Sequence, residues 1–76
     1  VRRPQGSYTV RLLEDENLRL KKIGEEAAEL ILALGRGERE RAAEEAADLT
    51  YHLLAALLAA GVTLDHLLDA LERRRG

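Results

Sequence analysis

The 76-residue sequence has no Cys, Met, Trp or Phe, a single Pro and two Tyr. Without Cys, neither disulfides nor thiolate metal sites can stabilise the fold. A chain of this length forms one domain at most and buries only about 60% of the surface that its unfolded form exposes. We therefore predict a single domain over residues 1–76 that gains further buried surface by oligomerisation.

The sequence also lacks a dominant charge and long apolar runs. Its formal net charge of −2 provides no general attraction for nucleic acid or a membrane surface. No apolar run reaches the roughly 20 residues that span a bilayer, and no segment resembles a signal peptide. We expect a cytoplasmic protein with neither a nucleic-acid nor a membrane partner, and, because the first residue is Val1, we expect residues upstream to be missing.

The residues that are abundant favour helix. Ala and Leu dominate, and Glu and Arg supply most of the rest, which predicts an all-α fold. Residues 1–6 contain the proline and a glycine and are expected to form an extended lead-in. Two short flanking helices are predicted, one over residues 8–13 capped by Ser7 and one capped by Thr63 that reaches about Arg74.

Two longer helices are predicted in the middle of the chain. Asp15 caps the first, over residues 16–34, in which Gly24 costs roughly 1 kcal/mol and implies a packing or functional reason. Glycines in the turn at 35–37 suit the end of that helix, and the second runs over residues 38–60. The tight turn predicts an antiparallel helical hairpin.

Both central helices are apolar around most of their circumference. Glu29 is the one charged residue between positions 27 and 35, and Asp48 is the one acid between positions 46 and 60. A helix that is apolar on most sides is buried on most sides, and one hairpin cannot bury itself. We predict that two copies form a four-helix-bundle core, as a homodimer or a dimer of dimers.

Two acidic pairs stand out on these helices. Glu26 and Glu29 are three residues apart, as are Glu45 and Asp48, and this spacing places each pair on one helix face. If the turn is centred on Gly37, Glu29 lies level with Glu45 and Glu26 lies level with Asp48. Four carboxylates at two matched heights predict one cluster.

Embedded carboxylates need a counter-charge because desolvation costs several kcal/mol per ion. A hard cation such as Mg²⁺, or alternatively Mn²⁺, supplies it and prefers oxygen ligands. Glu29 and Asp48 are the best candidates because their neighbours are apolar, whereas Glu45 ends an Arg- and Glu-rich segment that is typical of a salt-bridged surface. A solvated acidic face is the plain alternative. A di-iron site is disfavoured because no His lies three residues after a candidate Glu.

Three stretches resemble a known family. They are residues 6–9 (GSYT), 21–29 (KKIGEEAAE) and 45–52 (EAADLTYH). They closely resemble phosphoribosyl-ATP pyrophosphohydrolase of histidine biosynthesis, a branch of the MazG-like all-α nucleotide pyrophosphohydrolases. The resemblance covers about residues 4–75. The family has a further helix before GSYT, and we expect that helix to be missing here.

The resemblance implies hydrolysis of phosphoribosyl-ATP to phosphoribosyl-AMP and pyrophosphate, the second step of histidine biosynthesis, with Mg²⁺ assisting the attack of water. It implies catalytic roles for Glu25, which would orient water, and for Glu26 and Lys22. The implied metal ligands are Glu26, Glu29, Glu45 and Asp48. The implied substrate-binding residues are Ser7, Tyr8, Lys21, Lys22 and His52.

Other interpretations of these residues and of the chain remain open. Tyr8 could stack on a base or anchor the core, and His52 could line the pocket or stabilise an interface. A house-cleaning enzyme that cleaves (d)NTPs would keep the same chemistry with another substrate. A non-catalytic helical dimerisation module would use the acids in salt bridges, although Asp48 has no basic residue at i±3 or i±4 other than His52.

Overall fold

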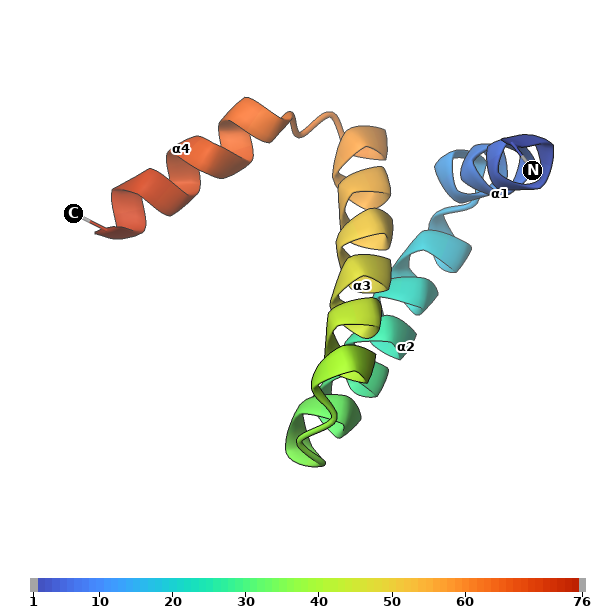
Figure 1. The fold of residues 1–76 in the computed structure, drawn as a ribbon. Helices are drawn as coiled ribbons and strands as arrows, with labels where there is room; N and C mark the ends of the chain where they lie inside the picture. The colour runs from blue at the N-terminus through green and yellow to red at the C-terminus, as the bar shows by residue number, and fades with distance from the viewer. Residues whose placement is uncertain (1, 76) are drawn as a thin grey trace.

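The structure, a computed structural model, describes residues 2–75 and the side chains of residues 8–75. Over residues 2–75 it contains four α-helices and no strand (Figure 1), which confirms the prediction of an all-α fold. The helices are α1 (Arg2–Glu14), α2 (Glu16–Gly35), α3 (Arg39–Ala59) and α4 (Leu64–Arg75).

Helix α1 corrects the prediction for the start of the chain. Residues 2–6 are helical rather than extended, so the helix does not begin after Ser7. Pro4 is tolerated because it lies in the first turn, where the missing N–H would have had no partner inside the helix. Ser7 therefore lies within the helix instead of capping it, and its side chain lies outside the described residues.

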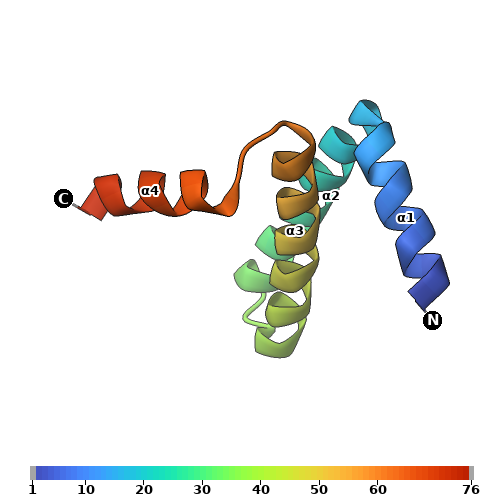
Figure 2. The ribbon, with the colours of Figure 1, turned by 90° about the horizontal axis from the view of Figure 1, so that it is seen from above.

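Helix α2 begins as predicted. Asp15 is its N-cap, and the Asp15 side chain accepts a hydrogen bond of 3.0 Å from the backbone N–H of Leu18. The turn after α2 contains Gly37 at φ 70°, a conformation that favours glycine. Helix α3 then returns alongside α2, and α1 packs against both (Figures 1 and 2).

Helix α4 points away from the other three helices. Gly61 at φ 79° ends the turn after α3, and Thr63 caps α4 as predicted. The Thr63 hydroxyl accepts from the His66 N–H, and His66 Nδ1 accepts from the Thr63 N–H, both at 3.1 Å. Within residues 2–75, α4 packs against no other helix (Figures 1 and 2).

Taken singly, none of the helices described over residues 2–75 is long and apolar enough to cross a membrane. Helices α3 and α4 together would meet that test of length and composition, but they are bent by 111° at the break between them.

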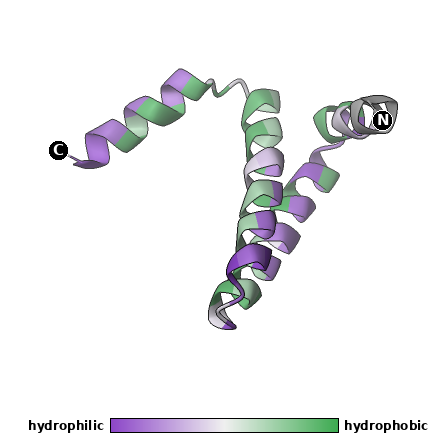
Figure 3. Ribbon diagram, in the orientation of Figure 1, coloured by the Kyte–Doolittle hydropathy of each residue, from purple (hydrophilic) through white to green (hydrophobic). Residues whose placement is uncertain are grey.

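The apolar core is small. Only Leu12, Ala33 and Ala55 are buried hydrophobic residues among those described, and most of the larger apolar side chains are exposed. Apolar residues accordingly recur on α3 and α4 in Figure 3. The buried polar residues are Glu26, Glu45 and His52. The contact between α2 and α3 is therefore partly polar, and this is where the candidate site lies.

Candidate metal centre

The carboxylates of Glu26 on α2 and Glu45 on α3 are buried between the two helices. Each residue is 7% exposed. Glu29 and Asp48 follow three positions later, and a three-residue step turns a side chain by about 60° around the helix. Both therefore fall at the margin of the contact and are exposed.

Three of the four predicted ligands meet. One carboxylate oxygen from each of Glu26, Glu29 and Glu45 lies within 4.8 Å of the others, and Asp48 is outside this group. Oε1 of Glu26 and Oε1 of Glu45 are buried and have no hydrogen-bond partner. Buried unpaired carboxylate oxygens are costly. The cluster fits a hard divalent cation because every donor is a carboxylate oxygen.

The burial of the four acids differs from the prediction. Glu45 was expected on a salt-bridged surface, but it is buried. Glu29 and Asp48 were expected in apolar surroundings, but both are exposed in this chain. Within one chain the apolar neighbours of Glu29 and Asp48 along the sequence are themselves largely exposed, so they do not bury either acid.

Basic residues neutralise part of the cluster. Lys22 Nζ lies 3.5 Å from Glu26 Oε2 and 3.4 Å from Glu25 Oε1. Lys21 Nζ, on an exposed side chain, lies 3.8 Å from Glu25 Oε2. The structure thus places the predicted residues Lys22 and Glu25 beside Glu26.

Arg41 is a residue that the sequence analysis did not single out. Its Nε donates a 3.1 Å hydrogen bond to Glu45 Oε2 across one helical turn. The i, i+4 spacing of Arg41 and Glu45 was the available signal. It was interpreted as part of a solvated face, because only the fold shows that Glu45 is turned inward.

The cluster shifts the protonation of Glu29. The hydrogen bond that Glu29 can donate to Glu45 when protonated, and the negative charges of Glu45 and then Glu26, raise the pKa of Glu29 above its ordinary value of 4.5, against a smaller lowering by Arg41. Three carboxylates so close repel one another when all are ionised. The proximity that raises this pKa would also favour a bound cation, which removes the repulsion.

The pKa of Lys22 is raised as well, which for a lysine favours the charged form. Burial lowers the pKa of Lys22, but hydrogen bonds to Glu25 and Glu26 and nearby negative charge outweigh burial and raise it. Lys22 therefore stays charged beside the acids at neutral pH.

A second polar group ties α1 to α3. Tyr8 OH lies 2.7 Å from His52 Nε2, and His52 Nδ1 lies 2.8 Å from the Asp48 carbonyl oxygen. Because a carbonyl only accepts, Nδ1 carries the proton, and the Tyr8 hydroxyl donates to Nε2. Tyr51, which the sequence analysis did not select, stacks on Tyr8 with ring centroids 6.3 Å apart. Tyr51 directly precedes His52, which was its only sequence signal.

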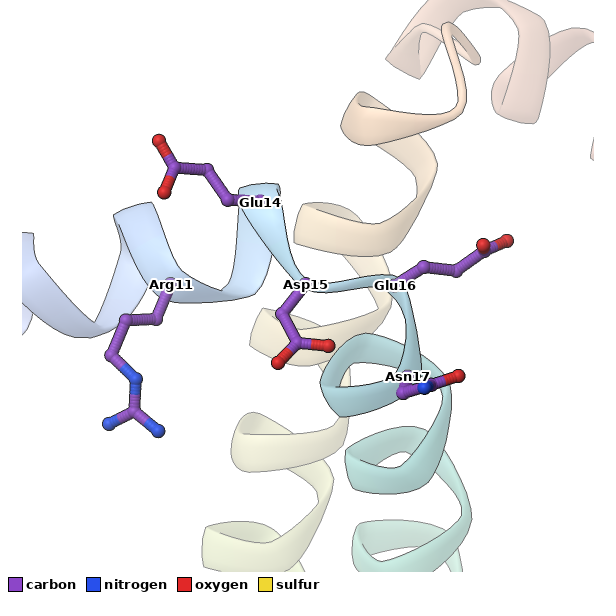
Figure 4. A pocket seen from close by; sticks show the side chains of 5 residues that line it. All are labelled: Arg11, Glu14, Asp15, Glu16 and Asn17. Carbon is purple, nitrogen blue, oxygen red and sulfur yellow. The ribbon is translucent and has the colours of Figure 1, made fainter.

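A hollow lies at the junction of α1 and α2 (Figure 4), and it shares no lining residue with the acid cluster. Its lining residues are Arg11, Glu14, Asp15, Glu16 and Asn17. Three carboxylates make this hollow a poor receptor for a polyphosphate. Arg19, just beyond, donates from Nη1 to the carbonyl oxygens of Leu12 and Leu13 at 3.0 and 2.8 Å, and so closes the end of α1.

Fold and site together define a class: an all-helical protein in which two adjacent helices concentrate carboxylates suited to a hard divalent cation. Residues 1–75 match the family model described as phosphoribosyl-ATP pyrophosphohydrolase. The chain belongs to this family, which confirms the resemblance found in the sequence.

Relatives agree with the family. A phosphoribosyl-ATP pyrophosphatase of Methanoregula boonei is 51% identical over 74 residues, covering 93% of this chain and 71% of its own. One of Caulobacter vibrioides is 47% identical over 73 residues, covering 96% and 68%. The histidine biosynthesis bifunctional protein HisIE of Thermotoga maritima is 42% identical over 73 residues, covering 95% of this chain and 37% of that protein. No solved structure matches.

Proposed function

We propose that this chain hydrolyses phosphoribosyl-ATP to phosphoribosyl-AMP and pyrophosphate in histidine biosynthesis. The observation that carries the proposal is the acidic cluster of Glu26, Glu29 and Glu45, which lies in a chain matched to the family over residues 1–75. The relatives are named for this activity, and the pathway is consistent with the HisIE relative. We expect the enzyme to work in the cytoplasm.

The cluster is proposed to hold Mg²⁺, with Mn²⁺ as the alternative. Glu26, Glu29 and Glu45 would be ligands. Asp48 would be a fourth, because it follows Glu45 by the same three-residue step by which Glu29 follows Glu26 on the antiparallel helix. When bound, a divalent cation would polarise phosphate oxygens and offset the charge that builds on the leaving pyrophosphate. The unpaired oxygens of Glu26 and Glu45 support this assignment.

Two neighbouring residues are proposed to act on the substrate and the water. Lys22, held between Glu25 and Glu26, would place its positive charge against a phosphate oxygen. Glu25 is partly exposed and would accept a hydrogen bond from the water that attacks phosphorus. The bond from phosphorus to the pyrophosphate oxygen then breaks, and no covalent intermediate with the protein is needed.

The contacts of Tyr8 and His52 favour a role in anchoring α1 over a role in substrate binding. Their polar groups are bonded to each other, and His52 is buried. Their proposed role is to hold α1 against α3, close to Lys22. Lys21 remains a candidate for attracting the polyphosphate because its side chain is exposed.

We also propose that the chain works as a homodimer in which α2 and α3 of two copies form a four-helix core. The support is the apolar surface that one copy leaves exposed on these helices, including Leu20, Ile31 and Leu53. A single chain whose buried hydrophobic residues, among those described, are Leu12, Ala33 and Ala55 is marginal by itself.

The test is pyrophosphate release by the purified chain with Mg²⁺, offered phosphoribosyl-ATP and a panel of NTPs and dNTPs. We expect release from phosphoribosyl-ATP and at least 100-fold less activity in Glu29→Gln. Glu44→Gln is the matched control because Glu44 is an exposed neighbour outside the cluster. Cleavage of NTPs alone would indicate a house-cleaning enzyme, and no cleavage of any nucleotide would favour the non-catalytic module.

A further inference from the structure

Helix α4 has the pattern of a packed helix but no partner in its own chain. Leu64, Leu67, Leu68 and Leu71 recur at i, i+3, i+4 and i+7, which lines them up on one face. Three of these leucines are at least half exposed, and α4 packs against no other helix within residues 2–75. A helix of 12 residues is marginal in water without tertiary contacts.

The exposed area of the whole chain indicates what covers this leucine face. A compact monomer of 8.4 kDa would expose about 4,600 Å², whereas this chain exposes 6055 Å². The excess, about 1,400 Å² per chain, would amount to about 2,900 Å² between two copies. Obligate homodimers bury about 2,000–5,000 Å² in total, so a second copy of this chain matches the surface in size.

The leucine face of α4 continues onto α3. The hollow at their junction is lined mainly by apolar residues, among them Leu54 and Leu58 of α3 and Leu64 of α4. Leu54 and Leu58 lie on the side of α3 opposite Glu45, facing away from α2. In a dimer with a two-fold axis each contact occurs twice, so α4 of either copy would lie on α3 of the other.

The connection between the helices holds α4 away from its own α3. Gly61 has a positive φ, and Thr63 and His66 cap each other's backbone groups. The two helices are bent by 111° at this break. Folding α4 back along its own α3 would require this turn to be rebuilt, whereas docking on a second copy preserves it.

We propose that α4 is an arm whose leucine face packs on the outward leucines of α3 in a second copy of this chain. The arm presupposes the proposed dimer and supplies a contact between its two copies. It also explains why four leucines line one face of a helix that packs against no other helix within residues 2–75.

The absence of native Cys makes single-cysteine cross-linking a clean test. Leu68→Cys and Leu54→Cys chains are refolded together, joined with a short bis-maleimide and analysed by mass. We expect the mixed product, with at least 10-fold less from Asp69→Cys plus Leu54→Cys, because Asp69 lies on the face of α4 opposite the leucines. Equal yields from the two mixtures would overturn the arm. So would a cross-link confined to one chain in a Leu54→Cys, Leu68→Cys double variant.

Sedimentation of Leu68→Glu supplies the second measurement. Leu68 is 51% exposed, so the charge does not disturb the chain's own core. We expect the dimer dissociation constant to rise at least 10-fold, with Asp69→Asn unchanged. An unchanged dimer would refute the arm while leaving the proposed dimer and enzyme intact. A wild-type monomer at micromolar concentration would refute both arm and dimer, and pyrophosphate release from the same preparation tests the enzyme separately.

Discussion

Glu26 and Glu45 are held in the same way on two different helices. Oε2 of Glu26 lies 3.5 Å from Lys22 Nζ, and Oε2 of Glu45 lies 3.1 Å from Arg41 Nε. In both pairs the basic side chain belongs to the residue four positions earlier on the same helix. The Oε1 atom of each glutamate remains buried without a hydrogen-bond partner. A cation could engage both free oxygens without breaking either ion pair.

Metal binding should stabilise the fold. Because a cation would bind the folded chain and not the dispersed acids of the unfolded one, Mg²⁺ at 100 times its dissociation constant should add about 2.7 kcal/mol. For a domain of this size each kcal/mol raises the melting midpoint by about 4–8 °C. Melting curves with Mg²⁺ or EDTA would measure the shift. Glu45→Gln should lose most of it and Glu44→Gln should keep it; a full shift in Glu45→Gln would contradict the assignment.

Without metal, the pH dependence of the stability should reveal the repulsion between Glu29 and the neighbouring carboxylates. The pKa of Glu29 is raised above 4.5 in the folded chain, so its stabilising contribution is present below the unfolded pKa and is lost as the pH rises through the folded one. The wild-type melting midpoint in EDTA should therefore fall relative to that of Glu29→Gln as the pH rises above about 4. Parallel curves for the two proteins would show that the acids do not interact.

Tyr8→Phe should lower stability more than catalysis. It removes the hydroxyl that donates to His52 Nε2 and leaves a buried acceptor unpaired, at a cost of about 1–3 kcal/mol. Urea unfolding would measure the loss, and steady-state kinetics should show KM for phosphoribosyl-ATP within about threefold of wild type. A large rise in KM at unchanged stability would instead show that Tyr8 binds the substrate.

Gly24→Ala tests whether the surface at Gly24 is open to solvent or lies in a dimer interface. A Cβ at Gly24 would meet nothing within 4 Å in one chain, so the substitution should stabilise an isolated helix by roughly 1 kcal/mol. If a second copy packs there, the added methyl group should weaken the dimer instead. We expect the dimer dissociation constant, measured by sedimentation, to rise about 10-fold. A more stable protein with an unchanged dimer would remove Gly24 from the interface.

Much of the local structure was predictable because its causes lie within a few residues. Asp15 and Thr63 cap the helices that they were predicted to cap, since a cap depends only on the next turn. The start of α1 was mispredicted because Pro4 opposes helix in general but is tolerated in a first turn.

The acidic pairs were the feature that the sequence by itself determined: their three-residue spacing already placed each pair on one face, and the stretches that contain them helped to identify the family. Which acids are buried was decided only by the tertiary structure. Burial depends on how far each helix is rotated toward its neighbour, and neighbours in sequence do not fix that angle. The fold turns Glu26 and Glu45 inward and leaves Glu29 and Asp48 at the margin, so the residue least expected to be buried, Glu45, lies at the centre of the site.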